Sequence, residues 1–235
     1  MGKSSIIRRV LIVTIACLLL MMIALFVLNS NLARFTVTEH EAQVVTPTEP
    51  FDSVNVQSPD LDVLLSASED GVCRISIPQS KSFIYETTIE NGALNVVKVY
   101  TAPWYVTLFD SFGRYEGVRI ELPEKDYAAL TVQVRSGNVV VGENLRFDSA
   151  GIRLNSGNLD FRGAGGELNL SASSGNLCLR GVAAKEIALQ TASGNIDLTD
   201  VQTEGLRTLV TSGNTKLDRV NCATLNAKGK AATAS

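Results

Sequence analysis

A Ser-Gly-Asn triplet occurs five times in the second half of this chain, at nearly constant spacing. Successive triplets are 20, 18, 19 and 19 residues apart. A fixed period near 19 residues is typical of a repeat protein, in which one small unit is stacked many times. The repeat therefore constrains the fold more than any local pattern does. The triplets are Ser136-Gly137-Asn138, Ser156-Gly157-Asn158, Ser174-Gly175-Asn176, Ser193-Gly194-Asn195 and Ser212-Gly213-Asn214.

Each triplet lies within the same pattern of apolar residues. Counted from the Ser, these residues stand six, four and two positions before it and three, five and eight or nine positions after it. Such alternation predicts short strands with one buried face. A coil cannot hold itself together alone, because each large aliphatic contributes only roughly 1.5–3 kcal/mol on burial. The first two repeats bury Leu130, Val132, Val134, Val139, Val141 and Leu145, then Ala150, Ile152, Leu154, Leu159, Phe161 and Ala164.

Stacking these coils about 4.8 Å apart would align equivalent side chains in continuous columns. The sequence thus predicts an all-β fold, a single-stranded parallel β-solenoid with about 19 residues per coil. The triplet suits its corners. Gly tolerates the positive φ of a sharp turn, Asn amides can form a ladder along the stack, and Ser can cap backbone groups. We interpret the five triplets as structural corners rather than as a chemical motif.

The beginning of the chain has a different character. Residues 10–28 contain no charge, Pro or Gly, and the flank 1–9 carries Lys3, Arg8 and Arg9. As a helix, this run would be about 28 Å long, close to the roughly 30 Å hydrocarbon core of a bilayer. We expect a transmembrane anchor at 10–28 with its basic flank in the cytoplasm. A cleaved secretory signal is the alternative, although its apolar region is usually only about 7–15 residues long.

The rest of the chain divides into a spacer, a domain and a tail. Residues 29–50 are rich in Thr, Glu and Pro and predict an extended extracytoplasmic spacer. Residues 51–228 form the solenoid domain, irregular over 70–128 and regular over 130–228. The segment Ser58-Pro59-Asp60 is interpreted as an upstream version of the triplet, and Asn91-Gly92 as a hairpin turn. Residues 229–235 are a flexible tail.

Charge and cysteine content exclude several classes of function. Beyond the basic flank, 18 Lys and Arg face 24 Asp and Glu, so we expect no nucleic-acid binding, which requires a basic face. Three cysteines, Cys73, Cys178 and Cys222, lie outside the anchor, without a close-spaced pair. A disulfide framework and a cysteine-based metal site are therefore not expected. No cofactor motif is present.

The sequence offers no arrangement typical of catalysis. The single His, His40, lies in the spacer, which removes His-dependent nucleophilic arrangements and His-based zinc sites. Asp160 and Asp197 fall in one predicted exterior column with Cys178 between them, about 9.6 Å apart. Paired carboxylates can cleave glycans, so an enzyme acting on cell-wall glycan stays open if Asp160, Asp197, Glu143 and Glu167 cluster on one face. We predict no catalytic and no metal-binding residues.

Aromatic residues gather in the irregular section. Residues 100–115 contain six of the chain's 14 Phe, Tyr and Trp residues. They are interpreted either as a loop that covers an apolar flank or as a binding surface for sugar rings, a partner protein or the lipid interface. This possible binding surface comprises Trp104, Tyr105, Phe109, Phe112 and Tyr115.

The order of these segments resembles a bacterial protein family. The features are an anchor and spacer, Phe51-Asp52-Ser53-Val54-Asn55-Val56, then Val118-Arg119-Ile120-Glu121-Leu122-Pro123, and finally the repeated Ser-Gly-Asn units. This layout is similar to the "putative adhesin" domain family of unknown function, which includes LiaG-type membrane-anchored envelope proteins. The resemblance covers roughly residues 51–228. It implies a surface β-solenoid in bacteria and supplies no catalytic residues.

Taken together, the sequence predicts a non-enzymatic, single-pass protein of the plasma membrane that displays a β-solenoid outside the cell. We expect binding or scaffolding, either adhesion-like or within an envelope-stress system, with an envelope protein or cell-wall component as partner. Two alternatives stay open at this point. One is the glycan-acting enzyme, and the other is a solenoid that polymerises end to end.

Overall fold

The structure is a computed structural model that describes residues 42–78, 80, 82–102, 117–229 and 232–234. The chain divides into two compact units, Met1–His40 and Glu41–Ser235, and all the described residues belong to the second. The predicted anchor at 10–28, most of the spacer and His40 therefore lie outside the described residues. Within the described ranges, no helix has the length and apolar character needed to cross a membrane.

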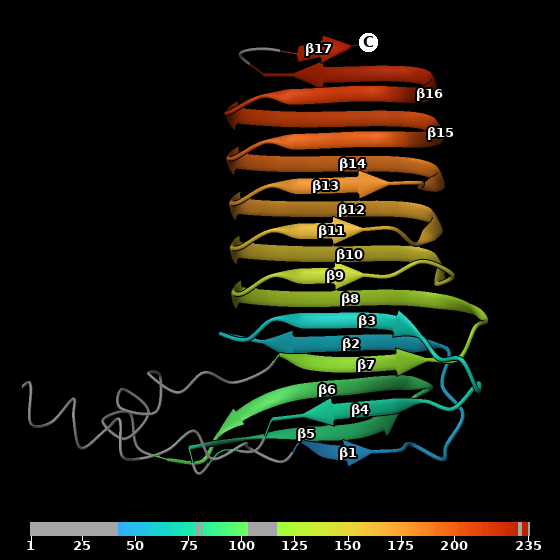
Figure 1. Cartoon of the computed structure of the whole chain (residues 1–235), viewed down its shortest axis with the longest axis vertical. Coiled ribbons are helices and arrows are strands. Elements are labelled where there is room, and N and C mark those ends of the chain that lie inside the picture. The colour runs from blue at the N-terminus through green and yellow to red at the C-terminus, as the bar shows by residue number, and fades with distance from the viewer. Residues whose placement is uncertain (1–41, 79, 81, 103–116, 230–231, 235) are drawn as a thin grey trace, which may run out of the picture. The chain divides into compact units, whose positions relative to one another are not determined.

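The described residues form an all-β fold built around a parallel β-solenoid of about five turns, with about 19 residues per coil. Both features of the predicted fold class are thereby confirmed. Figure 1 shows the coils stacked in chain order from β8 to β16. The strands are β8 (Asp126–Ser136), β9 (Val139–Val141), β10 (Arg146–Ser156), β11 (Leu159–Phe161), β12 (Ala164–Ser174), β13 (Leu177–Arg180), β14 (Ala183–Ser193), β15 (Ile196–Ser212), β16 (Thr215–Lys228) and β17 (Ala232–Ala234).

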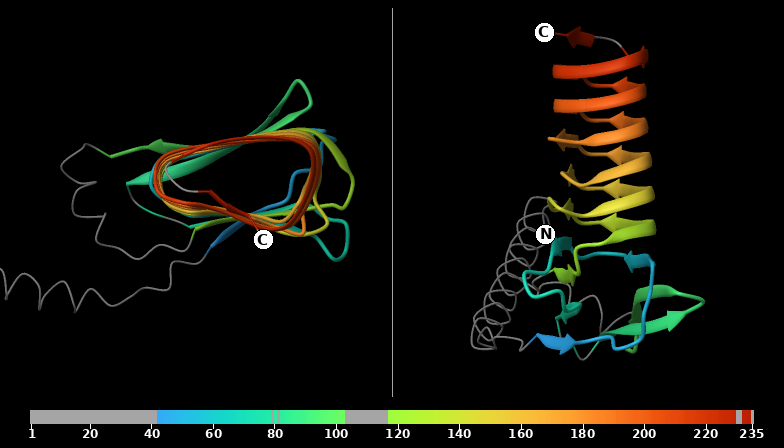
Figure 2. Two further views of the ribbon diagram at one scale, coloured as in Figure 1. Left: turned by 90° about the horizontal axis from the view of Figure 1, so that it is seen from above. Right: turned by 90° about the vertical axis from the view of Figure 1, so that its right-hand side faces the viewer.

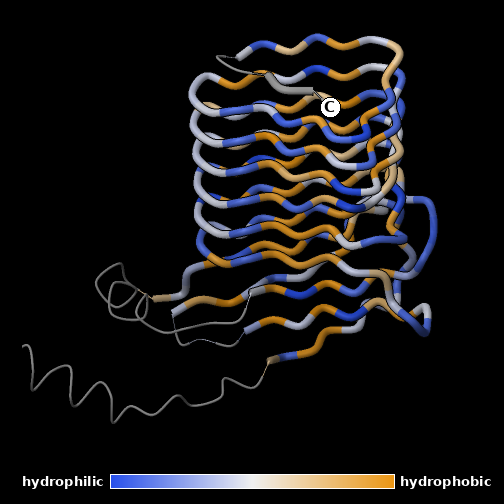
Figure 3. Tube along the Cα trace, turned by 45° about the horizontal axis from the view of Figure 1, so that its top comes forward, coloured by the Kyte–Doolittle hydropathy of each residue, from blue (hydrophilic) through white to orange (hydrophobic). Residues whose placement is uncertain are grey.

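The register between coils aligns equivalent residues of the repeat. Ser156 of β10 lies opposite Ser136 of β8 on one side and Ser174 of β12 on the other. Val132 and Ile152 pair in the same way and are both fully buried. Seen along the stack in Figure 2, the regular coils superpose as one closed ring. Figure 3 shows apolar and polar residues alternating along each coil, as a strand with one buried face requires.

The first part of the domain is stacked in a different order from its order in the chain. Its strands are β1 (Gln43–Val45), β2 (Ser53–Ser58), β3 (Val63–Ala67), β4 (Arg74–Ile77), β5 (Phe83–Glu90), β6 (Ala93–Tyr100) and β7 (Val118–Leu122). β2 pairs in parallel with both β6 and β8, and β3 pairs in parallel with both β7 and β9. The coil of β2 and β3 is therefore inserted between strands β6 and β7 on one side and the regular coils on the other (Figure 1).

Antiparallel strands close this end of the stack. β4 pairs antiparallel with β7, β1 pairs antiparallel with β4, and β5 forms a hairpin with β6. The hairpin turns at Asn91 and Gly92, whose φ angles of 52° and 76° are typical of a type I′ turn. The turn predicted at Asn91-Gly92 is confirmed. The irregular section is thus a small mixed sheet continuous with the solenoid.

The predicted alignment of Ser58-Pro59-Asp60 with the triplets is wrong by two residues. Ser58 pairs with Val134, and Val63 pairs with Val139, so Asp62 takes the place of Asn138. Ser58 points into the core, where its hydroxyl forms a 2.8 Å hydrogen bond with the Tyr85 hydroxyl. A polar residue at an interior position concealed this register from the sequence pattern.

The variation in repeat length is confined to one corner of the coil. Five residues separate Val141 from Phe147, three separate Phe161 from Gly165, and four separate the equivalent positions in later coils. We call the segments 142–145, 162–163 and 180–182 the variable corner. Because the second coil is short here, Gly163 rather than the predicted Ala164 lies level with Leu145, and Ala164 pairs with Arg146.

Candidate functional site

The Ser-Gly-Asn triplets form a tightly packed edge that we call the glycine corner. Their glycines have φ between 132° and 151°, where a side chain is strongly disfavoured. A Cβ on Gly157 would overlap the Gly137 carbonyl oxygen and lie 2.7 Å from its carbon, and Gly175 contacts Gly157 in the same way. Glycine is therefore required here because successive backbones touch.

A ladder of asparagines runs along the same corner. Asn158 accepts hydrogen bonds at Oδ1 from the backbone N–H and the Nδ2 of Asn176, at 3.0 and 3.1 Å. Asn138 and Asn195 take part in equivalent bonds. The ladder begins at Asp62, whose Oδ1 accepts the Asn138 N–H at 2.6 Å. The polar groups are used within the ladder, which is the arrangement of a structural edge.

The four carboxylates considered for glycan cleavage come from four different strands or connecting segments. Asp160 and Asp197 are separated by Cys178 in the strand register. Asp160 is instead bound by Arg162 and Arg180, at 2.9 and 3.2 Å. Glu143 also faces Arg162, and Glu167 lies on β12 rather than on β11.

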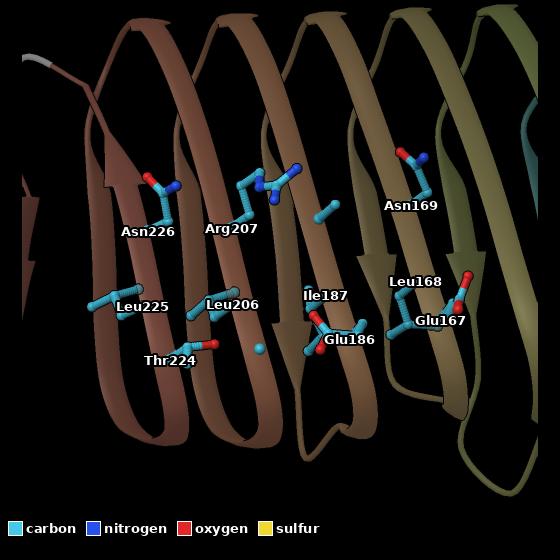
Figure 4. Close-up of a pocket in the computed structure, with 12 residues that line it drawn as sticks. Glu167, Leu168, Asn169, Glu186, Ile187, Leu206, Arg207, Thr224, Leu225 and Asn226 are labelled. Carbon is cyan, nitrogen blue, oxygen red and sulfur yellow. The ribbon is translucent and has the colours of Figure 1, made fainter.

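A shallow groove crosses four successive strands on the outside of the solenoid. It has a volume of about 280 Å³ and runs over β12, β14, β15 and β16. Figure 4 shows two rows of polar side chains, Asn169, Arg207 and Asn226 in one and Glu167, Glu186 and Thr224 in the other. Between them lies the column Leu168, Ile187, Leu206 and Leu225, of which the first three are core residues with only 2–3% of their surface exposed. We call this feature the axial groove, because it runs along the stack.

Two small residues open the axial groove. Gly205 stands where the neighbouring coils have Glu186 and Thr224, and Ala188 stands between Asn169 and Arg207. The Glu186 carboxylate bends over Gly205, into the space that a side chain there would fill. Sequence analysis missed this site because it considered only interior positions. Small residues at exterior positions of a repeat were the available signal.

The predicted aromatic binding surface, Trp104, Tyr105, Phe109, Phe112 and Tyr115, lies outside the described residues. The residues that flank this aromatic segment on either side belong to the described ranges. Tyr100 ends β6, and Gly117 leads into β7, where a Cβ on Gly117 would lie 2.5 Å from the Asp62 carbonyl oxygen. Strands β6 and β7 form the coil below β2 and β3, so these two described residues lie at the position where other coils have the triplet.

A buried lysine lies beside the start of this segment. The Lys98 ammonium contacts the Asp60 carboxylate and stands 3.6 Å from the centre of the Phe83 ring. Tyr100 donates a 3.0 Å hydrogen bond to the same carboxylate. Burial, together with this bond, raises the pKa of the Tyr100 hydroxyl to about 12. The cluster fixes the hairpin of β5 and β6 against the glycine corner.

The three cysteines of the domain are free and do not approach one another as pairs. Burial raises the pKa of Cys73 to about 11, which disfavours the reactive thiolate. Across the part of the chain that the structure describes, no group of three or more His, Cys, Asp or Glu side chains is placed to hold a metal ion.

The described residues define a parallel β-solenoid with a shallow groove on its outside. Residues 51–235 match the family described as Toastrack DUF4097, and the chain belongs to this family. The resemblance predicted from the sequence is thereby confirmed. No curated protein matches the chain.

Several solved structures are similar to this chain. A putative adhesin from Bacteroides fragilis is 14% identical, with a TM-score of 0.46, over 82% of this chain and 96% of that one. A putative adhesin from Parabacteroides distasonis is 9% identical, with a TM-score of 0.42, over 83% and 98%. A putative cell adhesion protein from Clostridium sporogenes is 9% identical, with a TM-score of 0.34, over 80% and 100%.

Proposed function

We propose that this chain is a membrane-anchored, non-enzymatic protein of the bacterial cell envelope whose β-solenoid binds or scaffolds another envelope component. Residues 10–28 anchor it in the plasma membrane, with the N-terminus in the cytoplasm and the solenoid outside. The partner is an envelope protein or a cell-wall component, in an adhesion-like or envelope-stress role. The aromatic segment at Trp104 and the axial groove are its contact surfaces.

The observation that carries this proposal is the form of the axial groove. It extends across four coils, or about 14 Å along the stack, and presents amide, carboxylate and guanidinium side chains along its two sides, with Leu225 exposed at one end. A few precisely placed polar groups are what fix the orientation of a bound ligand. A shallow, open groove of this length suits a partner with an extended conformation. It also lacks the enclosed, convergent acid and base of an enzyme site.

The test is photo-crosslinking in the native host, carried out on the full chain. A photo-crosslinking amino acid replaces Ala188 in the groove or, as a control, Lys216, which is exposed on β16. After an alkaline wash, we expect the chain to stay in the membrane fraction with its N-terminal segment intact. We further expect a crosslinked species from position 188 and none from position 216.

Two results would contradict the proposal. Release of the chain by the alkaline wash, or cleavage after residue 28, would remove the anchor. Identical crosslinks from both positions, unaffected by Arg207→Glu in the groove, would remove the groove as the contact surface.

A further inference from the structure

The variable corner contains a second hollow, separate from the axial groove. The long first coil projects Glu143 and Asn144 outward, whereas the short second coil turns sharply at Arg162. The space between them and the next coil forms a hollow of about 770 Å³. It exists because two consecutive coils depart from the 19-residue period in opposite directions. In repeat proteins, such departures in loop length often map to a binding face.

Three arginines from successive coils line this hollow, namely Arg146, Arg162 and Arg180. Lys125 also lines it, although its ammonium donates a hydrogen bond to the Phe51 carbonyl. Three carboxylates, Glu124, Asp126 and Glu143, belong to the same lining, so four cations against three anions leave one net positive charge. Guanidinium groups are well suited to bind the oxygens of carboxylates and phosphates, often through two parallel hydrogen bonds.

Most of the guanidinium N–H groups at this site are not used by the protein. Arg162 donates two hydrogen bonds to Asp160, at 3.4 and 2.9 Å, and Arg180 donates one, at 3.2 Å. Arg146 approaches Asp126 only as an exposed ion pair at 3.4 Å. Each guanidinium can donate about five hydrogen bonds. Further oxygens can therefore bind without breaking the bonds to Asp160.

Acidic groups at the rim limit which ligands can bind. Glu143 lies 3.9 Å from Arg162, and Glu124 is held by a 3.1 Å hydrogen bond from Asn144. An exposed ion pair such as that of Glu143 with Arg162 contributes about 0–1 kcal/mol, so a ligand oxyanion can displace the Glu143 carboxylate. The carboxylate of Asp160, by contrast, holds Arg162 and Arg180 in place and orients their free edges.

We propose that this hollow binds an oxyanion, a carboxylate or a phosphate group, carried by a polymer of the cell envelope. One such group bridges guanidiniums carried by neighbouring coils, whose backbones are spaced about 4.8 Å apart. The hollow shares no lining residue with the axial groove. It adds a charge-selective contact to the display surface.

The experiment uses the full chain in nanodiscs of zwitterionic lipid, so that the lipid contributes no net charge. Polyphosphate and polyglutamate of equal charge are the two probes, and the dissociation constant is measured for each. We compare the wild type with the triple variant Arg146→Gln, Arg162→Gln, Arg180→Gln. The control is Arg119→Gln, Arg135→Gln, Arg153→Gln, which removes the same charge from exposed positions elsewhere on the domain.

We expect the hollow variant to bind at least one probe about tenfold or more weakly, because charge-assisted hydrogen bonds are lost. The control should change by less than about twofold. Binding of polyphosphate alone assigns the site to phosphate, and binding of polyglutamate alone assigns it to carboxylate. No binding of either probe, or equal losses in both triple variants, would overturn the proposal without affecting the groove.

A single substitution keeps the test valid if the triple variant does not fold. Glu143→Gln removes the carboxylate that competes for Arg162, and it leaves the three arginines in place. We expect this variant to bind the same probe severalfold more tightly. Unchanged or weaker binding would contradict the role assigned to Arg162.

Discussion

The glycine corner and the variable corner belong to the same coils, yet they differ in nearly every physical respect. At the glycine corner, backbones of successive coils touch at Gly157 and Gly175, and the asparagine ladder uses the side-chain amides. At the variable corner, segments of three lengths are accommodated, and charged side chains stand around a hollow. One corner fixes the stack, which leaves the other free to vary. The invariant motif therefore marks structure, and the variation in spacing marks the surface that can acquire a function.

The largest effect is expected at the glycine corner. Gly157→Ala should destabilise the domain by at least about 3 kcal/mol, because φ is +132° and the new Cβ would overlap the Gly137 carbonyl. Gly151→Ala is the matched control, since a Cβ there meets open space, and it should change stability by less than about 1 kcal/mol. Denaturant unfolding measures both. Equal effects would show that the glycine corner is no more constrained than an ordinary strand.

A smaller effect is expected from changing the length of the variable corner. Insertion of one Gly after Glu143 should cost less than about 1 kcal/mol, because an exposed segment absorbs an extra residue at little entropic cost. The same insertion between Gly157 and Asn158 should prevent the stack from forming beyond that coil. Circular dichroism and limited proteolysis distinguish the two outcomes. Similar damage from both insertions would remove the contrast between the corners.

The smallest effect concerns the aromatic side chains behind the variable corner. Tyr127 packs between Phe51 and Phe147, with ring centres 6.1 and 5.7 Å away, and burial raises the pKa of its hydroxyl. Because the folded pKa is raised, the associated stability is complete below the unfolded pKa of about 10. It is lost as the pH rises toward the folded value.

An alkaline spectrophotometric titration tests this point. Tyr127→Phe should remove one phenol that titrates late, without a loss of stability at neutral pH beyond that of its 2.9 Å hydrogen bond to the Pro123 carbonyl. Titration of all phenols near pH 10 in the folded protein would show that the aromatic stack is open to water.

The two ends of the stack also differ, and this bears on end-to-end polymerisation. At the N-terminal end, antiparallel strands β1, β4 and β5 replace the parallel edge that a second solenoid would need. At the other end the core is open: Leu225 is 50% exposed, whereas Leu206 one coil below is 3% exposed. Toward this end, the side chains of one interior column become smaller, from Leu189 through Thr208 to Ala227. A small apolar surface facing an unmatched edge gives little driving force for a polymer.

Much of the regular solenoid could be predicted from the residues alone. Interior positions such as Ile152, Leu170 and Leu198 alternate with polar ones, and the local pattern is repeated often enough to fix the register. Two predictions, the interior position of Ala164 and the alignment of Ser58 with a triplet, were wrong for the same reason. Each lies where the repeat changes length or places a polar residue inside, so counting from the triplet no longer identifies the interior residue.

The candidate sites were harder to predict than the fold. Arg162 and Arg180 both stand six residues after the Ser of their triplets, whereas Arg146 stands ten residues after its own, so no single offset connects the three arginines. Gly205 and Ala188 open the axial groove only because larger residues stand above and below them. Such sites depend on absent side chains and on neighbours from other coils, and a linear pattern does not report either.

The sequence by itself determined the period, the buried face of each strand and the residue type at each glycine corner, because these follow from local alternation and backbone sterics repeated in every coil. Only the tertiary structure decided that the coil of β2 and β3 is inserted between later strands, that Asp62 begins the asparagine ladder, and that two irregular coils enclose a charged hollow. These features rest on pairing between residues up to 76 positions apart, as for Asp62 and Asn138. Such long-range pairing depends on which strands still have an unpaired edge in the folded stack, and a local sequence pattern does not contain that information.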